Sequence, residues 1–214
     1  MKKTGLLIAA MIAALVLASG VAWAATVRCE GGKCGGTQKG DRMLGTDRRD
    51  VVYGRGGQDD LYLRGGNDEA RGGPGNDKIL GNDGSDYFLE GGDGDDLIRG
   101  GRGYDGLMGD RGDDVVEGGP SRDELHGWWG GDTILGGEGP DYIEPNPWWG
   151  YPQEGPQDTE DDVQAGPGND DIYMGYLDET VDHVDCGEGT DWVWEVTNPT
   201  TTEDTFVNCE NIGD

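Results

Sequence analysis

Aspartate recurs with a nine-residue period through the middle of this chain. Frames of nine residues can be laid from Gly36 to Glu144 if Glu90 is left out as a one-residue insertion, and the sixth position of every frame is then aspartate. These position-six aspartates are Asp41, Asp50, Asp59, Asp68, Asp77, Asp86, Asp96, Asp105, Asp114, Asp123, Asp132 and Asp141. Carboxylate oxygens are ligands that hard divalent cations such as Ca²⁺ prefer. The spacing therefore predicts a row of cation sites rather than a single site.

Two further positions of the frame are constrained. Glycine occupies position four in most frames, which permits a turn with positive φ and brings carbonyl oxygens inward. Position eight is apolar throughout, which predicts one inward side chain per frame. The position-eight residues are Met43, Val52, Leu61, Ala70, Ile79, Phe88, Ile98, Leu107, Val116, Leu125, Ile134 and Ile143. We interpret each frame as a turn of about six residues and a strand of about three, so that two frames form one coil and turns two frames apart stack on one edge.

The frames 72–80, 91–99 and 100–108 follow the pattern G-G-x-G-x-D-x-U-x, in which U is apolar. On these motifs the chain resembles the hemolysin-type (RTX) calcium-binding nonapeptide-repeat family, strongly over 36–144 and weakly over 156–194. The resemblance implies an all-β fold, a parallel β-roll (β-solenoid). It also implies several Ca²⁺ ions as cofactor, each held between two same-edge turns by glycine-turn carbonyls and position-six aspartates.

The resemblance assigns the metal ligands to a defined set of residues. The expected metal residues are Asp59, Asp68, Asp77, Asp86, Asp96, Asp105, Asp114, Asp123, Asp132 and Asp141, together with Gly72, Gly75, Gly91, Gly94, Gly100, Gly103, Gly109 and Gly112. The expected pairs are Asp59 with Asp77, Asp77 with Asp96, Asp86 with Asp105, Asp96 with Asp114, Asp105 with Asp123, Asp114 with Asp132, and Asp123 with Asp141. The alternative is that these aspartates only cap turns through Asx hydrogen bonds.

Several frames depart from the pattern. Lys39 and Arg48 stand at position four of the first two frames, which argues against binding at Asp41 and Asp50. Ser121 replaces a position-four glycine, and Trp128 replaces a second glycine, which weakens the site at Asp132. Degenerate frames resume after residue 155 and keep acids at position six, but only two of them have a convincing turn. The acids of these degenerate frames are Asp161, Asp170, Asp182 and Asp191.

The composition is strongly acidic and rich in glycine. The 214 residues include 44 Asp and Glu against 16 Lys and Arg, and 43 Gly, for a net charge of −28. Such a composition is typical of disordered chains, but disorder does not require the phased aspartates. We expect a chain that is largely unfolded without metal and folded in calcium. The charge also excludes nucleic acid as a partner, because phosphate would be repelled.

The first 24 residues have the features of a secretory signal peptide. Lys2 and Lys3 precede an apolar stretch from Leu6 to Ala18, and Ala22-Trp23-Ala24 fits a cleavage site. The apolar stretch is shorter than the roughly 20 residues that span a bilayer, although a retained anchor is the alternative. No second spanning segment is evident. We therefore expect a secreted protein, extracellular or at the cell surface, without a membrane span after cleavage.

Four cysteines lie near the two ends of the mature chain, and export would place them in a compartment where disulfides persist. Four cysteines allow three pairings, of which we favour the local one, Cys29–Cys34 and Cys186–Cys209. We expect 25–35 to be an N-terminal cap, 36–144 the regular roll and 145–155 a loop rich in Pro and Trp. Residues 156–194 are expected to be degenerate repeats and 195–214 a C-terminal cap.

Two Trp-Trp-Gly sequences stand out from the repeats. Trp128, Trp129, Trp148 and Trp149 could form an exposed platform for a cell-surface or matrix polysaccharide or protein, or could pack against the roll. No H-E-x-x-H or G-x-S-x-G motif is present, so we expect no enzyme. The leading hypothesis is a secreted, non-enzymatic calcium-binding protein with a structural, sequestering or adhesive role. The alternative is a carbohydrate- or surface-binding module that uses the tryptophans.

Overall fold

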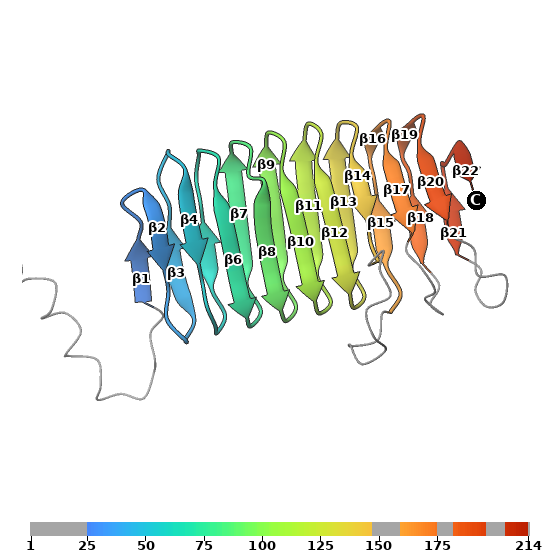
Figure 1. The fold of residues 1–214 in the computed structure, drawn as a ribbon. Helices are drawn as coiled ribbons and strands as arrows, with labels where there is room; N and C mark the ends of the chain where they lie inside the picture. The colour runs from blue at the N-terminus through green and yellow to red at the C-terminus, as the bar shows by residue number, and fades with distance from the viewer. Residues whose placement is uncertain (1–24, 147–158, 175–181, 196–203, 214) are drawn as a thin grey trace, which may run out of the picture.

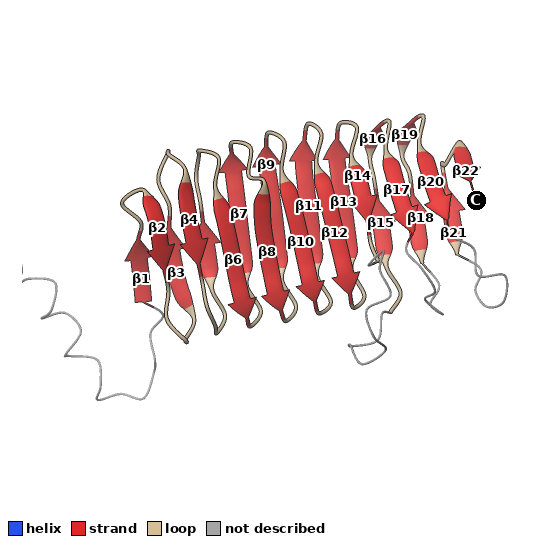
Figure 2. Cartoon of the chain, in the orientation of Figure 1, coloured by secondary structure: helices blue, strands red, loops and turns tan. Residues whose placement is uncertain are grey.

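A computed structural model describes residues 25–146, 159–174, 182–195 and 204–213, and this part of the chain contains strands, turns and no helix (Figure 2). The strands form two parallel ten-stranded sheets and one short pair, β16 (Pro167–Gly168) with β19 (Glu188–Gly189). Consecutive strands alternate between the two large sheets, so the chain winds as a β-solenoid of about nine turns (Figure 1). The predicted all-β parallel β-roll is confirmed.

The first sheet contains the odd-numbered strands as far as β15. In spatial order it consists of β1 (Ala25–Arg28), β3 (Asp41–Leu44), β5 (Asp60–Tyr62), β7 (Lys78–Asp83), β9 (Leu97–Arg102), β11 (Val115–Pro120), β13 (Thr133–Glu138), β15 (Asp162–Gln164), β18 (His183–Asp185) and β21 (Thr205–Val207). The second sheet consists of β2 (Gly32–Gly35), β4 (Asp50–Tyr53), β6 (Glu69–Pro74), β8 (Phe88–Asp93), β10 (Gly106–Arg111), β12 (Glu124–Trp129), β14 (Tyr142–Glu144), β17 (Asp171–Met174), β20 (Trp192–Glu195) and β22 (Asn211–Gly213).

In the interior, most strands of the two large sheets contribute one buried apolar side chain, and these side chains stack in two columns. In the first sheet Ile98 of β9 pairs in register with Ile79 and Val116, and all three are fully buried. In the second sheet Leu107 stacks in the same way between Leu89 and Leu125. Such a core is narrow, because each of the two facing sheets contributes a single column of side chains. Burial of apolar surface alone therefore contributes less per residue than in a two-layer domain.

The strands are longer than the sequence predicts. From β6 to β13 each strand has six residues and continues through positions one to three of the next frame. The expected turn of about six residues is therefore wrong in the central coils, where the turn is limited to positions four to six. The glycines at positions one and two continue the ladder because the backbones of stacked coils pair there in parallel, for example Gly73 of β6 with Gly92 of β8.

The insertion at residue 90 is also placed differently from the expectation. Leu89, not Phe88, occupies the buried column, and Glu90 lies in the strand opposite Arg71. The additional residue is accommodated at Tyr87, which is 59% exposed, between Asp86 and β8. A chain that must keep Asp86 in the aspartate row and an apolar side chain in the core has room for an extra residue only between them.

Two disulfides stand near the ends of the solenoid. Cys29 is bonded to Cys34, and Cys186 to Cys209, so the predicted local pairing is confirmed. The predicted signal peptide, most of the 145–155 loop, and Trp148 and Trp149 lie outside the described residues. Within the described ranges no helix is long and apolar enough to cross a membrane.

Candidate metal centre

The position-six aspartates form two continuous hydrogen-bonded rows, one along each edge of the solenoid. The backbone N–H of Asp77 donates to Oδ1 of Asp96 at 2.6 Å, and the N–H of Asp96 donates to Oδ1 of Asp114 at 2.7 Å. The same bond recurs on the opposite edge, from Asp86 to Asp105 at 2.8 Å and from Asp105 to Asp123 at 2.9 Å. Every pair that the sequence predicts is thus brought together, including Asp59 with Asp77, Asp114 with Asp132, and Asp123 with Asp141.

The second carboxylate oxygen of these aspartates is buried without a hydrogen-bond donor. This holds for Oδ2 of Asp59, Asp68, Asp77, Asp86, Asp96, Asp105, Asp114, Asp123, Asp132, Asp141, Asp170 and Asp191. An ionised carboxylate in this position is strongly unfavourable unless a proton or a cation neutralises it. The rows therefore have the chemistry of sites for a hard cation, repeated from coil to coil.

Burial shifts the pKa of these carboxyl groups well above the ordinary value. Burial raises the pKa of Asp96, Asp114 and Asp123 to about 8, and neighbouring carboxylates in the row add to the effect. A backbone hydrogen bond to each carboxylate opposes the shift but is the smaller influence. Burial likewise raises the pKa to about 7 for Asp68, Asp77, Asp132 and Asp170 and to about 6 for Asp59, Asp86, Asp105 and Asp141.

The glycines at position four bring stacked turns into close contact. Gly94 has φ +127°, and a Cβ on it would lie 2.5 Å from the carbonyl oxygen of Gly75 in the preceding turn. The same backbone approach repeats where Gly112 meets Gly94 and where Gly103 meets Gly84. These turns present carbonyl oxygens to the space between coils that a side chain would fill.

The glycines at position one have a different role. All four lie within strands, and a Cβ on each would collide with Oδ2 of the aspartate in its own frame; they are Gly72, Gly91, Gly100 and Gly109. These glycines make room for the carboxylate.

Side chains alone do not complete a calcium shell here. Within the described ranges no group of three or more His, Cys, Asp or Glu side chains is close enough to hold an ion. Because Ca²⁺ takes about six to eight oxygens, the position-four carbonyls would have to supply the remainder. The donor set that fits is therefore carbonyl oxygens of two stacked turns plus row aspartates, as the resemblance implies.

In the first two frames a threonine donates to Oδ2 of the position-six aspartate, the oxygen that has no donor in the later frames. The backbone N–H and the hydroxyl of Thr46 donate to Oδ2 of Asp50 at 2.7 and 2.9 Å, and Thr37 does the same for Asp41 at 2.5 and 2.9 Å. The sequence already indicated that these two frames bind calcium poorly, because Lys39 and Arg48 replace the position-four glycine. The threonine at position two of each of these frames was the available sequence signal, because its hydrogen bonds to the aspartate close the turn.

The rows extend beyond the predicted set. Asp132 donates to Asp161, Asp161 to Asp182, Asp141 to Asp170, and Asp170 to Asp191, all through backbone N–H groups. The last acceptors are Asp204, which receives the N–H of Asp182, and Glu210, which receives that of Asp191. Asp204 and Glu210 were not predicted from the sequence. Their distance of about two frames from the preceding acid was the available signal.

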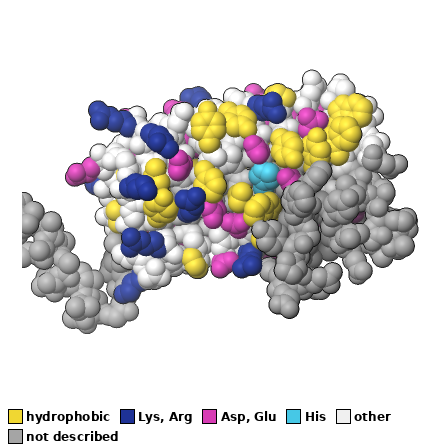
Figure 3. All heavy atoms as spheres, viewed as in Figure 1, with side chains coloured by type: hydrophobic (Ala, Val, Ile, Leu, Met, Phe, Trp, Pro, Cys, Tyr) yellow, Lys and Arg dark blue, Asp and Glu magenta, His cyan; other side chains and the backbone are white. Residues whose placement is uncertain are grey.

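The tryptophans lie on the outer face of the second sheet. Trp128 and Trp129 end β12 with their rings edge to face, 5.6 Å between centroids, and both are half-buried. Further along, Trp192 and Trp194 of β20 are exposed and stacked, with 5.3 Å between centroids. Figure 3 shows hydrophobic side chains gathered on this side of the molecule, with Lys and Arg side chains toward the N-terminal coils.

A family model described as the RTX calcium-binding nonapeptide repeat matches the chain in four copies, over residues 35–70, 64–89, 71–107 and 108–143. Together the copies cover about half of the 214 residues. A search of curated proteins found no match.

Proposed function

The chain belongs to the RTX calcium-binding nonapeptide-repeat family, and on this premise we propose that it is an exported, non-enzymatic structural protein whose solenoid folds as Ca²⁺ binds between stacked turns. The observation that carries the proposal is the row of buried Oδ2 atoms without donors. A core to which each sheet contributes a single column of apolar side chains provides little free energy to offset the cost of so many buried charges. Calcium offsets them by direct coordination.

A calcium titration of the mature polypeptide tests this proposal. Far-ultraviolet circular dichroism should show little β structure in excess EGTA and a cooperative gain as free calcium rises toward the millimolar range, where extracellular modules bind. Bound-metal analysis should count several ions per chain. Full β structure in EGTA, or no uptake of calcium, would contradict the proposal.

Export and an extracellular or cell-surface location are supported by two features. The N-terminal 24 residues fit a signal peptide. Two disulfides fit an oxidising compartment. Mass spectrometry of the protein recovered from culture medium should give Ala25 as its first residue.

A non-enzymatic role is supported by the structural use of the acidic residues. The phased aspartates are held in the backbone hydrogen-bonded rows rather than converging on one cleft. Within the non-enzymatic class, scaffolding, calcium sequestration and adhesion all fit a rigid, acidic, calcium-loaded rod.

A carbohydrate- or surface-binding module is the second candidate function. It is favoured by Trp128 and Trp129, which stand together on the outer face at the end of β12. A glycan array probed with the calcium-loaded protein tests it. Loss of signal in Trp128→Ala and Trp129→Ala, or in Trp148→Ala and Trp149→Ala, would identify which tryptophan pair is used.

A further inference from the structure

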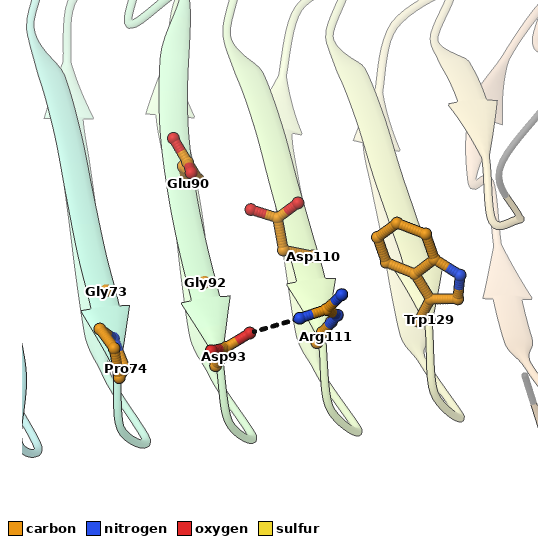
Figure 4. Close-up of a pocket in the computed structure, with 8 residues that line it drawn as sticks. All are labelled: Gly73, Pro74, Glu90, Gly92, Asp93, Asp110, Arg111 and Trp129. Atoms are coloured by element: carbon orange, nitrogen blue, oxygen red, sulfur yellow. Dashed lines mark hydrogen bonds and ion pairs between the residues drawn. The ribbon is translucent and has the colours of Figure 1, made fainter. Parts of the chain in front are cut away.

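A groove of about 290 Å³ crosses the outer face of the second sheet, over β6, β8, β10 and β12. Glu90, Asp93, Asp110, Arg111 and Trp129 line it, and Gly73 and Gly92 leave its floor without side chains (Figure 4). Its volume is sufficient for one or two sugar rings, and smaller than the range typical of drug-sized ligands.

The groove coincides with departures from the repeat. Position two of the frame is glycine in the adjacent coils, at Gly73 and Gly92, but is Asp110 in β10 and Trp128 in β12. Asp110 has φ +80° and Trp128 has φ +87°, and the two are partners in register. A left-handed conformation is unfavourable for residues with a Cβ. Positive φ at this frame position also occurs at Arg55, Arg64 and Asn82, so strain alone does not mark the groove. What distinguishes this location is that Asp110 replaces the repeat glycine and lines the groove, next to Trp129 of the following coil.

The lining combines a flat aromatic surface with several hydrogen-bonding groups. The guanidinium of Arg111 lies over the ring of Trp129, 5.4 Å from its centroid, and its Nη1 is 3.5 Å from Oδ1 of Asp93. Figure 4 shows this ion pair and the indole on the neighbouring strand. Burial raises the pKa of Asp110, and the neighbouring carboxyl group of Glu90 adds to the shift. An aromatic ring beside carboxyl and guanidinium groups can stack on the apolar face of a pyranose while the polar groups bind its hydroxyls.

The charge of the groove limits the class of sugar. Three carboxyl groups line it against the single guanidinium of Arg111, while Arg71 binds Glu90 at 2.7 Å from the side. A uronic acid or a sulfated sugar would face net repulsion.

We propose that this groove, lined by Trp129, Arg111, Asp110 and Glu90, is a binding subsite for a pyranose unit of a neutral or amino polysaccharide. The inference deepens the second candidate function and rests on the calcium-folded scaffold.

The test uses the mature calcium-loaded protein with cellotetraose and chitotetraose as probes and tetragalacturonate as the acidic comparison. Isothermal titration should detect the neutral or amino probe and not the acidic one. Trp129→Ala should weaken binding about tenfold, as expected for loss of one well-packed contact, whereas Trp129→Phe should retain part of it.

Asp110→Gly separates a binding role from a structural role. It restores the repeat glycine and relieves the left-handed strain, so the melting temperature should rise or stay equal while binding falls about tenfold. Arg64→Gly is the matched control. Arg64 also has positive φ, +80°, at the same frame position, but on the first sheet and outside the groove. This control should gain stability and bind as the wild type does.

The readouts distinguish the two proposals. If calcium uptake and circular dichroism are normal but neither neutral nor amino probe binds, or only the acidic probe binds, the subsite is wrong and the scaffold stands. If Asp110→Gly binds as tightly as the wild type, the subsite is likewise wrong. If the protein takes up no calcium, the scaffold proposal fails, and the subsite fails with it.

Discussion

At the residue scale, each row aspartate has two oxygens in different situations. Oδ1 of Asp96 accepts the backbone N–H of Asp77, whereas its Oδ2 is buried without a donor. An asparagine could keep the first bond and would carry no charge. The row therefore separates hydrogen bonding along the solenoid from charge neutralisation at the metal, and the two can be tested apart.

Asp96→Asn should change stability in opposite directions with and without calcium. In millimolar calcium the variant should lose one or two bound ions and about 1–3 kcal/mol in the free energy of unfolding, because a charged ligand is removed. In chelator it should be more stable than the wild type, because a buried unpaired charge is gone. Urea denaturation under both conditions, with bound-metal analysis, measures this.

Asp50→Asn is the matched control, since Thr46 already satisfies Oδ2 of Asp50. The number of bound ions should be unchanged. Equal losses of calcium in the Asp50 and Asp96 variants would contradict the assignment of the first frames as metal-independent.

Protons should partly replace calcium. Burial raises the pKa of Asp96, Asp114 and Asp123 to about 8 in the metal-free fold, against about 3.9 in an unfolded chain. Because the folded state then binds protons more tightly than the unfolded state, the free energy of unfolding rises as the pH falls from about 8 to about 4. The stabilisation is lost as the pH rises through the folded-state pKa.

Circular dichroism of the metal-free protein between pH 8 and pH 4 tests this prediction, and β structure should increase on acidification. In the presence of calcium, affinity for the ion should decrease over the same range, since protons and Ca²⁺ compete for the same oxygens. A metal-free chain equally unfolded at both ends of the range would show that burial does not raise these pKa values as described.

At the element scale, the central coils from β6 to β13 alternate six-residue strands with turns of positions four to six. The strand length follows from backbone pairing between coils, which includes glycines such as Gly73 and Gly92. In most frames the turn depends on a single position-four glycine, where carbonyl oxygens of neighbouring coils approach. A side chain at that glycine would separate the coils at the point where an ion must bridge them.

Gly94→Ala should therefore be severe. The new Cβ would lie 2.5 Å from the carbonyl oxygen of Gly75, in a backbone conformation of φ +127°, and we expect a loss of about 2–4 kcal/mol in calcium. Gly65→Ala is the control, because its nearest atom would be the carbonyl oxygen of Asp83 at 3.3 Å and its φ is outside the left-handed region. Thermal denaturation in calcium should show a small decrease in melting temperature for Gly65→Ala and a large one for Gly94→Ala. Similar decreases would contradict the close approach of stacked turns at the position-four glycines.

At the scale of the whole molecule, charge is distributed unevenly along the solenoid. No Lys or Arg follows Arg122 in the sequence, whereas the N-terminal coils contain basic residues in cross-strand pairs such as Arg49–Glu69 and Arg71–Glu90. The first two frames, which form one coil, also close their turns with Thr37 and Thr46. The C-terminal coils consequently depend more strongly on bound cations than the N-terminal coils do.

Removal of calcium should unfold the solenoid from its acidic end. Hydrogen exchange at partial chelation should show protection lost first in the strands after Arg122 and last in β3 and β4, because the Thr-capped turns need no ion. In saturating calcium the difference should shrink. Uniform loss of protection along the chain would instead indicate a single cooperative unit without this polarity.

The sequence by itself determined the repeat, the two aspartate rows and the all-β solenoid, and it favoured the local disulfide pairing that the structure contains. Each depends on spacing, and spacing along a solenoid translates directly into stacking because each coil contacts mainly its neighbours. The doubt about Asp41 and Asp50 was also readable, from Lys39 and Arg48.

Only the tertiary structure decided the features that depend on neighbouring coils. The placement of Leu89 in the core, the extra residue at Tyr87 and the end of the rows at Glu210 follow from register between strands. The groove beside Trp129 likewise joins residues from four strands that no single frame contains. The nine-residue pattern determines the features that every coil shares. The structural effect of an insertion or substitution depends on the neighbouring coil against which it packs, and the pattern alone does not give that neighbour.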